Sequence, residues 1–147
     1  MLVDQLKVVL ASSFVFYLKA HQFHWCVEGP NFSEYHKFLD DLNSEVYDNT
    51  IDRCAEFIRV LDHYTPGSLT RFKELSIIQD QTKIPRAELM MQELYNDNLM
   101  LIDLLKTTIE TASNEKEEGI ANFIAERIDA HGKHGWMLRS FLKKDRA

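Results

Sequence analysis

Histidines and carboxylates gather in one stretch of the sequence, between His21 and Glu56. Arg53 is the only basic residue from Asp40 to Glu56, whereas a merely solvated acidic helix face would normally contain lysines as well. Neutral imidazoles and carboxylates in one neighbourhood are ligands of iron, manganese and zinc. The stretch therefore predicts a metal site, with these candidate ligands: His21 and His24 before a turn at residues 27–31, and His36, Asp40, Asp41, Asp48, Asp52 and Glu56 after it.

Structural roles in caps and interfacial hydrogen bonds are the alternative for these side chains. His21 with His24, and His131 with His134, form pairs three residues apart that could bind zinc, but a pair without further ligands is usually structural. Three acids are expected to complement a helix dipole: Glu115, Glu117 and Glu118. We interpret Trp25 and Trp136 as packing residues, in the core or at an interface.

Composition is that of one globular domain, which we expect to span residues 1–147. The apolar fraction is 45% and the charged fraction 27%, which argues against a disordered or membrane protein. Cys26 and Cys54 form no CxxC motif and fit a reducing compartment. The apolar run near the start is interpreted as a core helix and not a signal peptide, so we expect a cytoplasmic protein.

Apolar periodicity and helix breakers predict four long helices and one short one. The expected spans are residues 2–26, about 34–61, 69–78, from Pro85 onward, and from about 115 to Lys143 and Lys144. Ser33 is expected to cap the second helix, Pro85 to occupy the first turn of the third, and Ser113 and Asn114 to end the third and cap the fourth. A connection of some two dozen residues precedes the third helix. We therefore predict an all-α, ferritin-like four-helix bundle with one long crossover that carries the short helix.

The first helix has apolar residues on more than one side. One broad face is expected to hold Leu6, Val9, Leu10, Phe14, Tyr17, Leu18 and His21, while Val8, Val15, Phe16 and Phe23 lie off that stripe. A helix buried on two sides needs a second partner, which a subunit interface would supply. The helix therefore predicts a homo-oligomer.

Two distant motifs resemble those of the Dps family, the ferritin-like mini-ferritins first described as DNA-binding proteins from starved cells. The first motif is HWxVxGxxF at residues 24–32, followed by His36, Asp40 and a DxxAE motif from Asp52 to Glu56. The second is the run from His131 to Arg139, which ends in WMLR. The resemblance covers nearly the whole chain.

The resemblance implies a twelve-subunit shell that oxidises ferrous iron with hydrogen peroxide or oxygen and stores the ferric product inside. It implies a catalytic metal site shared between subunits, with His24, His36 and Asp40 on one subunit and Asp52 and Glu56 on the other. Iron is the expected metal, with zinc or manganese as alternative occupants. A non-catalytic shell, structural or sequestering, with a degenerate metal site is the alternative function.

One extra residue separates this chain from the family pattern. His36 to Asp52 is a step of 16 residues, where the family leads us to expect 15. At about 100° per residue this insertion would turn Asp52 off the face of His36 and Asp40 unless the helix absorbs it as a π-bulge, which we place near residues 43–49. Asp41 stands 11 residues before Asp52, as the family's aspartate would, so either Asp40 or Asp41 is the expected ligand.

Two further departures concern basic residues. Phe57 stands where the family usually has an arginine after DxxAE. The net charge is -6, and near the C-terminal end only Lys143, Lys144 and Arg146 are basic. Because DNA binding requires clustered positive charge, we expect it to be weak or absent.

Overall fold

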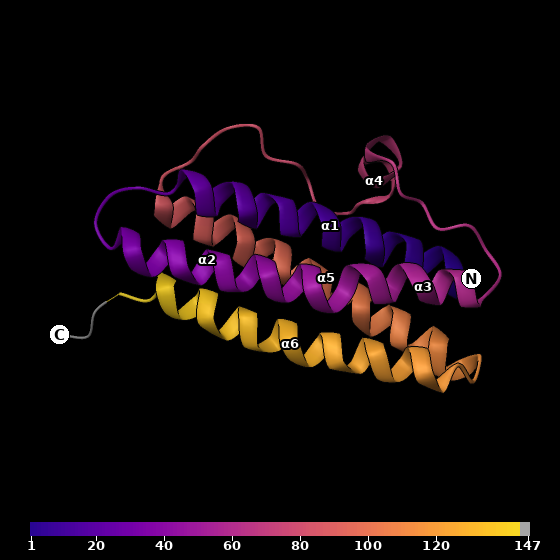
Figure 1. The fold of residues 1–147 in the computed structure, drawn as a ribbon. Coiled ribbons are helices and arrows are strands. Elements are labelled where there is room, and N and C mark those ends of the chain that lie inside the picture. The colour runs from indigo at the N-terminus through magenta and orange to yellow at the C-terminus, as the bar shows by residue number, and fades with distance from the viewer. Residues whose placement is uncertain (145–147) are drawn as a thin grey trace.

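The computed structural model describes residues 1–144, and within them every regular element is helical (Figure 1). The elements are α1 (Leu2–Cys26), α2 (Phe32–Val46), the π-helical segment η1 (Tyr47–Ile51), α3 (Asp52–Val60), α4 (Leu69–Leu75), α5 (Ala87–Asn114) and α6 (Glu118–Leu142). Because α2, η1 and α3 are continuous, they make one long rod, and with α1, α5 and α6 they form the predicted four-helix bundle. α4 lies in the crossover. Of the described helices, none combines the length and the apolar character needed to span a bilayer.

Several predicted helix ends were wrong by a few residues. Ser33 lies inside α2, whose N-cap is Asn31 in a left-handed conformation with φ 65°. Pro85 precedes α5, whose N-cap is Arg86, and Asn114 is the last residue of α5 and does not cap α6. The short helix ends at Leu75. Arg146 lies outside the described residues.

The core face of α1 differs from the predicted stripe. Leu6, Val9 and Leu10 are buried as expected, but the buried face then continues through Phe16 and Phe23. Phe14, Tyr17 and His21 are only half-buried, and Leu18 is exposed. Periodicity alone could not choose between the two faces because both are apolar.

The crossover is held against α1 and α5 by polar contacts. Lys19 is buried, and its Nζ lies 2.7 Å from Asp97 Oδ2 and 3.0 Å from Glu93 Oε2. Glu93 Oε1 in turn accepts a hydrogen bond from Gln81 Nε2 of the crossover at 2.8 Å. A buried ammonium needs such carboxylate partners, because an unpaired one would be costly to desolvate. These contacts fix where the crossover rejoins the bundle.

The segment η1 restores the helical phase that the extra residue would disturb. At about 100° per residue, twelve residues of regular helix would turn Asp52 about 120° from Asp40, whereas absorbing one residue leaves about 20°. The same correction keeps the core stripe continuous, since Val46, Cys54 and Ile58 are all fully buried. The π-bulge is therefore present, centred slightly after the predicted 43–49.

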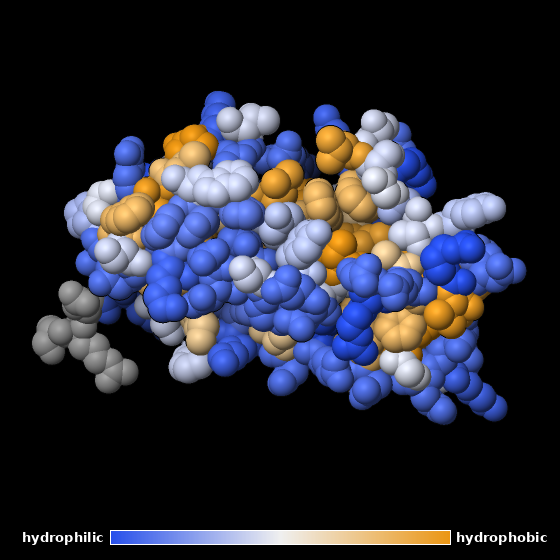
Figure 2. Space-filling view, in the orientation of Figure 1, coloured by the Kyte–Doolittle hydropathy of each residue, from blue (hydrophilic) through white to orange (hydrophobic). Residues whose placement is uncertain are grey.

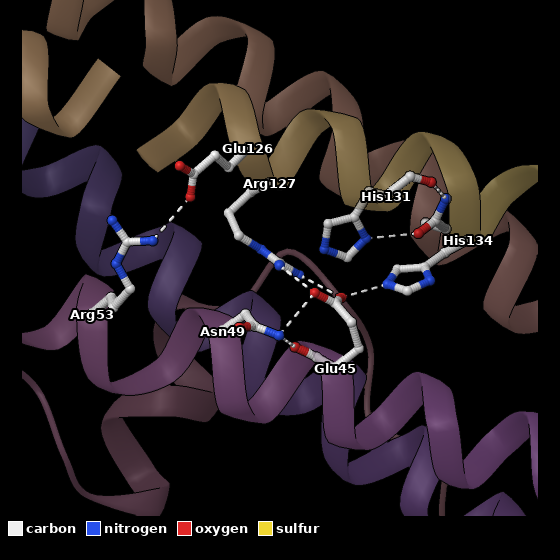
Figure 3. A network of polar contacts seen from close by, with 8 residues as sticks. Glu45, Asn49, Arg53, Glu126, Arg127, His131 and His134 are labelled. Atoms are coloured by element: carbon white, nitrogen blue, oxygen red, sulfur yellow. Dashed lines mark hydrogen bonds and ion pairs between the residues drawn. The ribbon is translucent and has the colours of Figure 1, made fainter. Parts of the chain in front are cut away.

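Contacts with α6 flank η1 on both sides (Figure 3). Before it, the Glu45 carboxylate accepts two hydrogen bonds from the Arg127 guanidinium, at 2.6 and 2.9 Å, and a third from His134 Nε2. After it, Arg53 pairs with Glu126 at 3.0 Å on the surface. The bidentate Glu45–Arg127 pair is the stronger constraint, because exposed pairs contribute little. Both ends of the bulge are thus held against α6.

Buried His131 extends this network into α5. Its Nδ1 donates to Asn98 Oδ1 at 2.8 Å, and Asn98 Nδ2 donates to the His131 carbonyl at 2.9 Å. Burial, together with the nearby Arg127 and His134, lowers the pKa of His131 well below its ordinary value of 6.5. The ring is therefore neutral in the folded protein at neutral pH.

Deleting Asp48 from η1 should leave the fold intact. Asp48 is exposed, and its removal converts the π-turn into regular α-helix while Val46, Cys54 and Asp52 keep their phase. We expect an unchanged or higher urea midpoint by circular dichroism at fixed protein concentration. Deleting exposed Asn96 from the middle of α5 is the control. It should cost at least about 3 kcal/mol, because it turns half of a core-lining helix by about 100°. Equal losses of stability for the two deletions would show that η1 does not accommodate an extra residue.

His131 should make stability fall on mild acidification. A base whose pKa is lowered by folding takes up its proton more readily in the unfolded chain, so its contribution is complete above pH 6.5 and is lost as pH falls below that value. Between pH 6.5 and 5 this loss should approach at most about 1.4 kcal/mol per pH unit. Urea unfolding should show that slope in the parent and in His63→Gln, whose histidine is exposed, and most of it should be lost in His131→Gln. An undiminished slope in His131→Gln would assign it to another group.

Candidate metal centre

A tight turn between α1 and α2 brings His24 and His36 together. Gly29 has φ 104°, a conformation that favours glycine, and Asn31 is left-handed. The two imidazole rings stack with centroids 3.9 Å apart and planes 13° apart. Each ring bonds to the backbone of the other residue: His24 Nδ1 lies 2.7 Å from the His36 carbonyl, and His36 Nδ1 lies 2.8 Å from the His24 carbonyl. The pair therefore links the end of α1 to the start of α2.

These hydrogen bonds determine the tautomer of both rings. A carbonyl oxygen only accepts, so each Nδ1 must carry the proton and donate it. In the neutral imidazoles each Nε2 is then an unprotonated acceptor, as a metal requires. Backbone carbonyls behind Nδ1 are a common way of orienting histidine ligands. The reciprocal pair thus presents two oriented donor nitrogens.

Asp40, and not Asp41, lies beside this histidine pair. Its Oδ1 is 3.9 Å from His24 Nε2, and the carboxylate is largely exposed. Asp41 turns toward solvent and pairs with Lys37 at 3.2 Å, one helical turn away. The geometry therefore favours Asp40 in the choice that the sequence left open. A ligand role for Asp40 remains a prediction.

Asp52 and Glu56 lie on α3, away from the histidine pair. They are four residues apart, so they share a helix face, and both are exposed. At about 1.5 Å rise per residue, Asp52 lies more than about 20 Å along the rod from His36. Accordingly, no three His, Cys, Asp or Glu side chains within the described part of the chain come close enough together to hold a metal ion. One subunit presents two separate groups of donors.

Comparison with known proteins agrees with the helical bundle. A family model described as a ferritin-like domain matches residues 3–147. The DNA protection during starvation protein 2 of Bacillus anthracis is 30% identical over 142 residues, 97% of each chain. The chain belongs to the Dps family of ferritin-like proteins. At the level of that family, it is an iron-storage protein.

Solved Dps structures have the same fold. Dps from Staphylococcus aureus superposes with a TM-score of 0.93 at 32% identity, covering 98% of this chain and 96% of that one. Dps from Listeria innocua, in crystals soaked with zinc, superposes with a TM-score of 0.91 at 27% identity, covering 97% and 96%. The family's fold is therefore retained despite the extra residue in the α2–η1–α3 rod.

Other candidate residues take different positions. His131 and His134 belong to the buried α6 network and lie away from the turn. Trp25 and Trp136 are 61% and 55% exposed, so neither packs in the core of the chain. Burial raises the pKa of Cys54 to about 12, which keeps that thiol protonated. The candidate ligands Asp48 and His21 also lie apart from the histidine pair's donor atoms. Asp48 is exposed in η1, and the ring of His21 packs against Tyr17 and Trp25.

Sequence reasoning missed the charged residues that hold the helices and the crossover together. Glu45, Arg127 and Lys19 were not singled out, although they are the charged groups that hold α2, α6 and the crossover in place. The burial of Lys19 and Arg127 could not be recognised in the sequence, because solvated charged residues also occupy such positions in helices. Only the position of Glu45, just before the extra residue, gave an indication in the sequence that this residue has a structural role.

Cobalt(II) titration should distinguish Asp40 from Asp41. Trp25 lies one residue from His24, so its fluorescence should be quenched by the ion, and Trp136→Phe removes the other tryptophan signal. In that background we expect Asp40→Asn to weaken binding by roughly tenfold or more, because a charged donor is lost. Asp41→Asn should bind like the parent, since its carboxylate faces Lys37. The assignment is reversed if Asp41→Asn has the larger effect.

Proposed function

We propose that this protein oxidises ferrous iron at a site shared by two subunits and stores the ferric product inside a closed shell of twelve. Ferrous iron is the substrate, and hydrogen peroxide or oxygen takes the electron. Family membership supports this proposal, because ferritin-like proteins of this kind are generally ferroxidases. The site residues are argued from the geometry of this chain, and the shell of twelve is what the resemblance to the Dps family implies.

The separation of the two donor groups carries the proposal. His24 and His36 present unprotonated Nε2 atoms beside Asp40, while Asp52 and Glu56 are exposed more than about 20 Å along the same rod. One chain cannot close both groups around one ion. A second copy related by a twofold axis can, because in an isologous contact each subunit offers both of its groups to the other. Such a contact makes two identical sites.

The phase set by η1 is what makes this contact feasible. Absorbing one residue leaves Asp52 about 20° and Glu56 about 60° from Asp40 around the rod. All three carboxylates then lie on one side of the rod, which a partner subunit can cover. Without the bulge, Asp52 would face about 120° away.

Exposed apolar side chains support burial against other subunits. An open groove of about 620 Å³ lies between α1 and the crossover, and its apolar lining includes Phe14, Leu18, Leu69 and Phe72. Figure 2 shows apolar side chains emerging near α4 and the neighbouring part of α1. Patches of this kind on one subunit often mark contacts with another. Trp25 is exposed on α1, which carries His24, and Tyr47 is exposed on η1, between the donors of α2 and those of α3.

The donor set suits the chemistry of iron. Carboxylates hold the harder ferric ion, and imidazole nitrogens retain affinity for ferrous iron. The backbone carbonyls behind both Nδ1 atoms keep the rings from turning when the ion is lost. The residues therefore bind and orient the ion, and the oxidant reaches it through the remaining open positions.

Removing the α3 carboxylates should abolish fast oxidation. The variant Asp52→Ala with Glu56→Ala loses one side of every site, so ferric absorbance after anaerobic iron loading and peroxide addition should rise only at the buffer's rate. Assembly should persist, because exposed carboxylates without partners contribute little to folding. Sedimentation should give about twelve times the 17.2 kDa chain mass for both proteins.

The matched control removes two exposed carboxylates from α5, as Asp103→Ala with Glu110→Ala. This control and His63→Ala should oxidise iron like the parent. If the α3 variant oxidises iron as fast as its parent, the proposed site is wrong. If the α3 variant fails to assemble, the carboxylates hold the interface instead, and a non-catalytic shell becomes the better account.

DNA binding is not part of this proposal. The net charge of -6 disfavours contact with phosphates at physiological salt, where the Debye length is about 8 Å. Lys143 and Lys144 are the exposed basic residues at the end of the described chain. The starvation-protection name of the Bacillus anthracis relative describes that protein.

A further inference from the structure

Two histidines in the core of the bundle are not used by the proposed function. His131 and His134 lie one helical turn apart on α6, with ring centroids 5.4 Å apart, and only 1% and 7% of them are exposed. Glu45 of α2 directs its carboxylate to the same place, because its Oε1 accepts a hydrogen bond from His134 Nε2 (Figure 3). Metal sites in four-helix bundles are built from such side chains on facing helices. Two imidazoles and one carboxylate are also a ligand set that zinc uses in proteins.

The ring of His131 is oriented from behind, as the ring of a metal ligand would be. Asn98 Nδ2 donates to the His131 carbonyl, so Asn98 Oδ1 is the atom that accepts the hydrogen bond from His131 Nδ1. The proton is therefore on Nδ1, and Nε2 is the unprotonated nitrogen. Figure 3 shows this second ring nitrogen on the side of the Arg127 side chain. Asn98 thus has the orienting role that a carboxylate or a backbone carbonyl has behind many histidine ligands.

The guanidinium of Arg127 lies among these groups. Its Nη1 and Nη2 donate to Glu45 at 2.6 and 2.9 Å, and after burial its charge is the next cause of the lowered pKa of His131. Only 3% of Arg127 is exposed, and its Nε has no hydrogen-bond partner among the described residues. The surroundings therefore supply Arg127 with a counter-charge but do not match all of its donor groups. What they match is a positive charge beside the Glu45 carboxylate.

We propose that Arg127 fills a cation position in the bundle core, where the carboxylate and the two imidazoles would otherwise bind a divalent transition metal. The guanidinium holds these three side chains apart, in agreement with the absence of a cluster that could hold an ion among the described residues. Without it, the donors can turn into the vacated space, and Glu45, whose side chain is 29% exposed, gives an ion access from solvent. Arg127 thereby confines divalent metal to the exposed donors of α1, α2 and α3. Only this consequence rests on the proposed function.

Cobalt(II) binding by Arg127→Ala tests the cation position. Assembled protein is dialysed against cobalt(II), and the metal bound per chain is compared with that of the parent, so that ions at the exposed donors cancel. We expect about one extra ion per chain, with the strong visible absorption of cobalt(II) in a site of low coordination number. Without metal the variant should unfold at a lower temperature than the parent, because Glu45 loses its main partner. Cobalt(II) should restore most of that loss, because it binds the folded protein.

Two further variants locate the extra ion. Arg53→Ala is the matched control, since it removes an arginine from the exposed contact between α3 and α6, and it should bind no more cobalt(II) than the parent. The double variant Arg127→Ala with Glu45→Gln should lose the extra ion, because it lacks the anionic ligand. An extra ion that persists in the double variant would lie elsewhere in the protein and would contradict the proposal.

Arg127→Gln fills more of the space and takes the place of Arg127→Ala if the alanine variant does not assemble. A folded and assembled variant that binds no extra ion would overturn the proposal, because Arg127 would then be only a structural partner of Glu45. Failure of both variants to refold in the presence of cobalt(II) would overturn it as well, since a bound ion should replace the lost charge. Slow iron oxidation by the parent would bear on the proposed function alone.

Discussion

The phase of the α2–η1–α3 rod is the constraint on which the rest of the structure depends. One rod supplies the core residues Val46, Cys54 and Ile58 on one side and the carboxylates Asp40, Asp52 and Glu56 on another. A single extra residue would turn everything after it by about 100°. The π-helical turn at Tyr47–Ile51 absorbs it, so the buried and exposed faces both remain continuous. Core packing and the proposed metal site therefore have the same structural requirement.

Contacts on two sides hold the bulge in place. On the bundle side, the Glu45 carboxylate binds Arg127 and His134 just before η1. Burial alone would raise the pKa of Glu45, but these hydrogen bonds outweigh burial and hold the pKa well below its ordinary value. On the other side, Tyr47 of the bulge packs against Tyr17 of α1. The region of the insertion therefore contacts both α6 and α1.

Much of the fold could be predicted from the sequence. Long stretches with helical apolar periodicity and few helix breakers permit few arrangements of the helices. The bulge was foreseen because a known motif spacing was exceeded by one residue. The buried face of α1 was misassigned, since Phe14 and Leu18 are as apolar as Phe16 and Phe23 but face the crossover groove. The sequence could not show that Asp40 lies beside the histidine pair while Asp41 pairs with Lys37, because this difference depends on the path of the turn between α1 and α2.

A complementation measurement tests the shared site most directly. One variant carries His24→Ala with His36→Ala and the other Asp52→Ala with Glu56→Ala, so each alone lacks half of every site. If each site combines two subunits, random co-assembly in equal amounts should restore about a quarter of the parental oxidation rate, since half of the twofold pairs are mixed and each mixed pair contains one intact site. Mixed shells no more active than either variant alone would contradict the account.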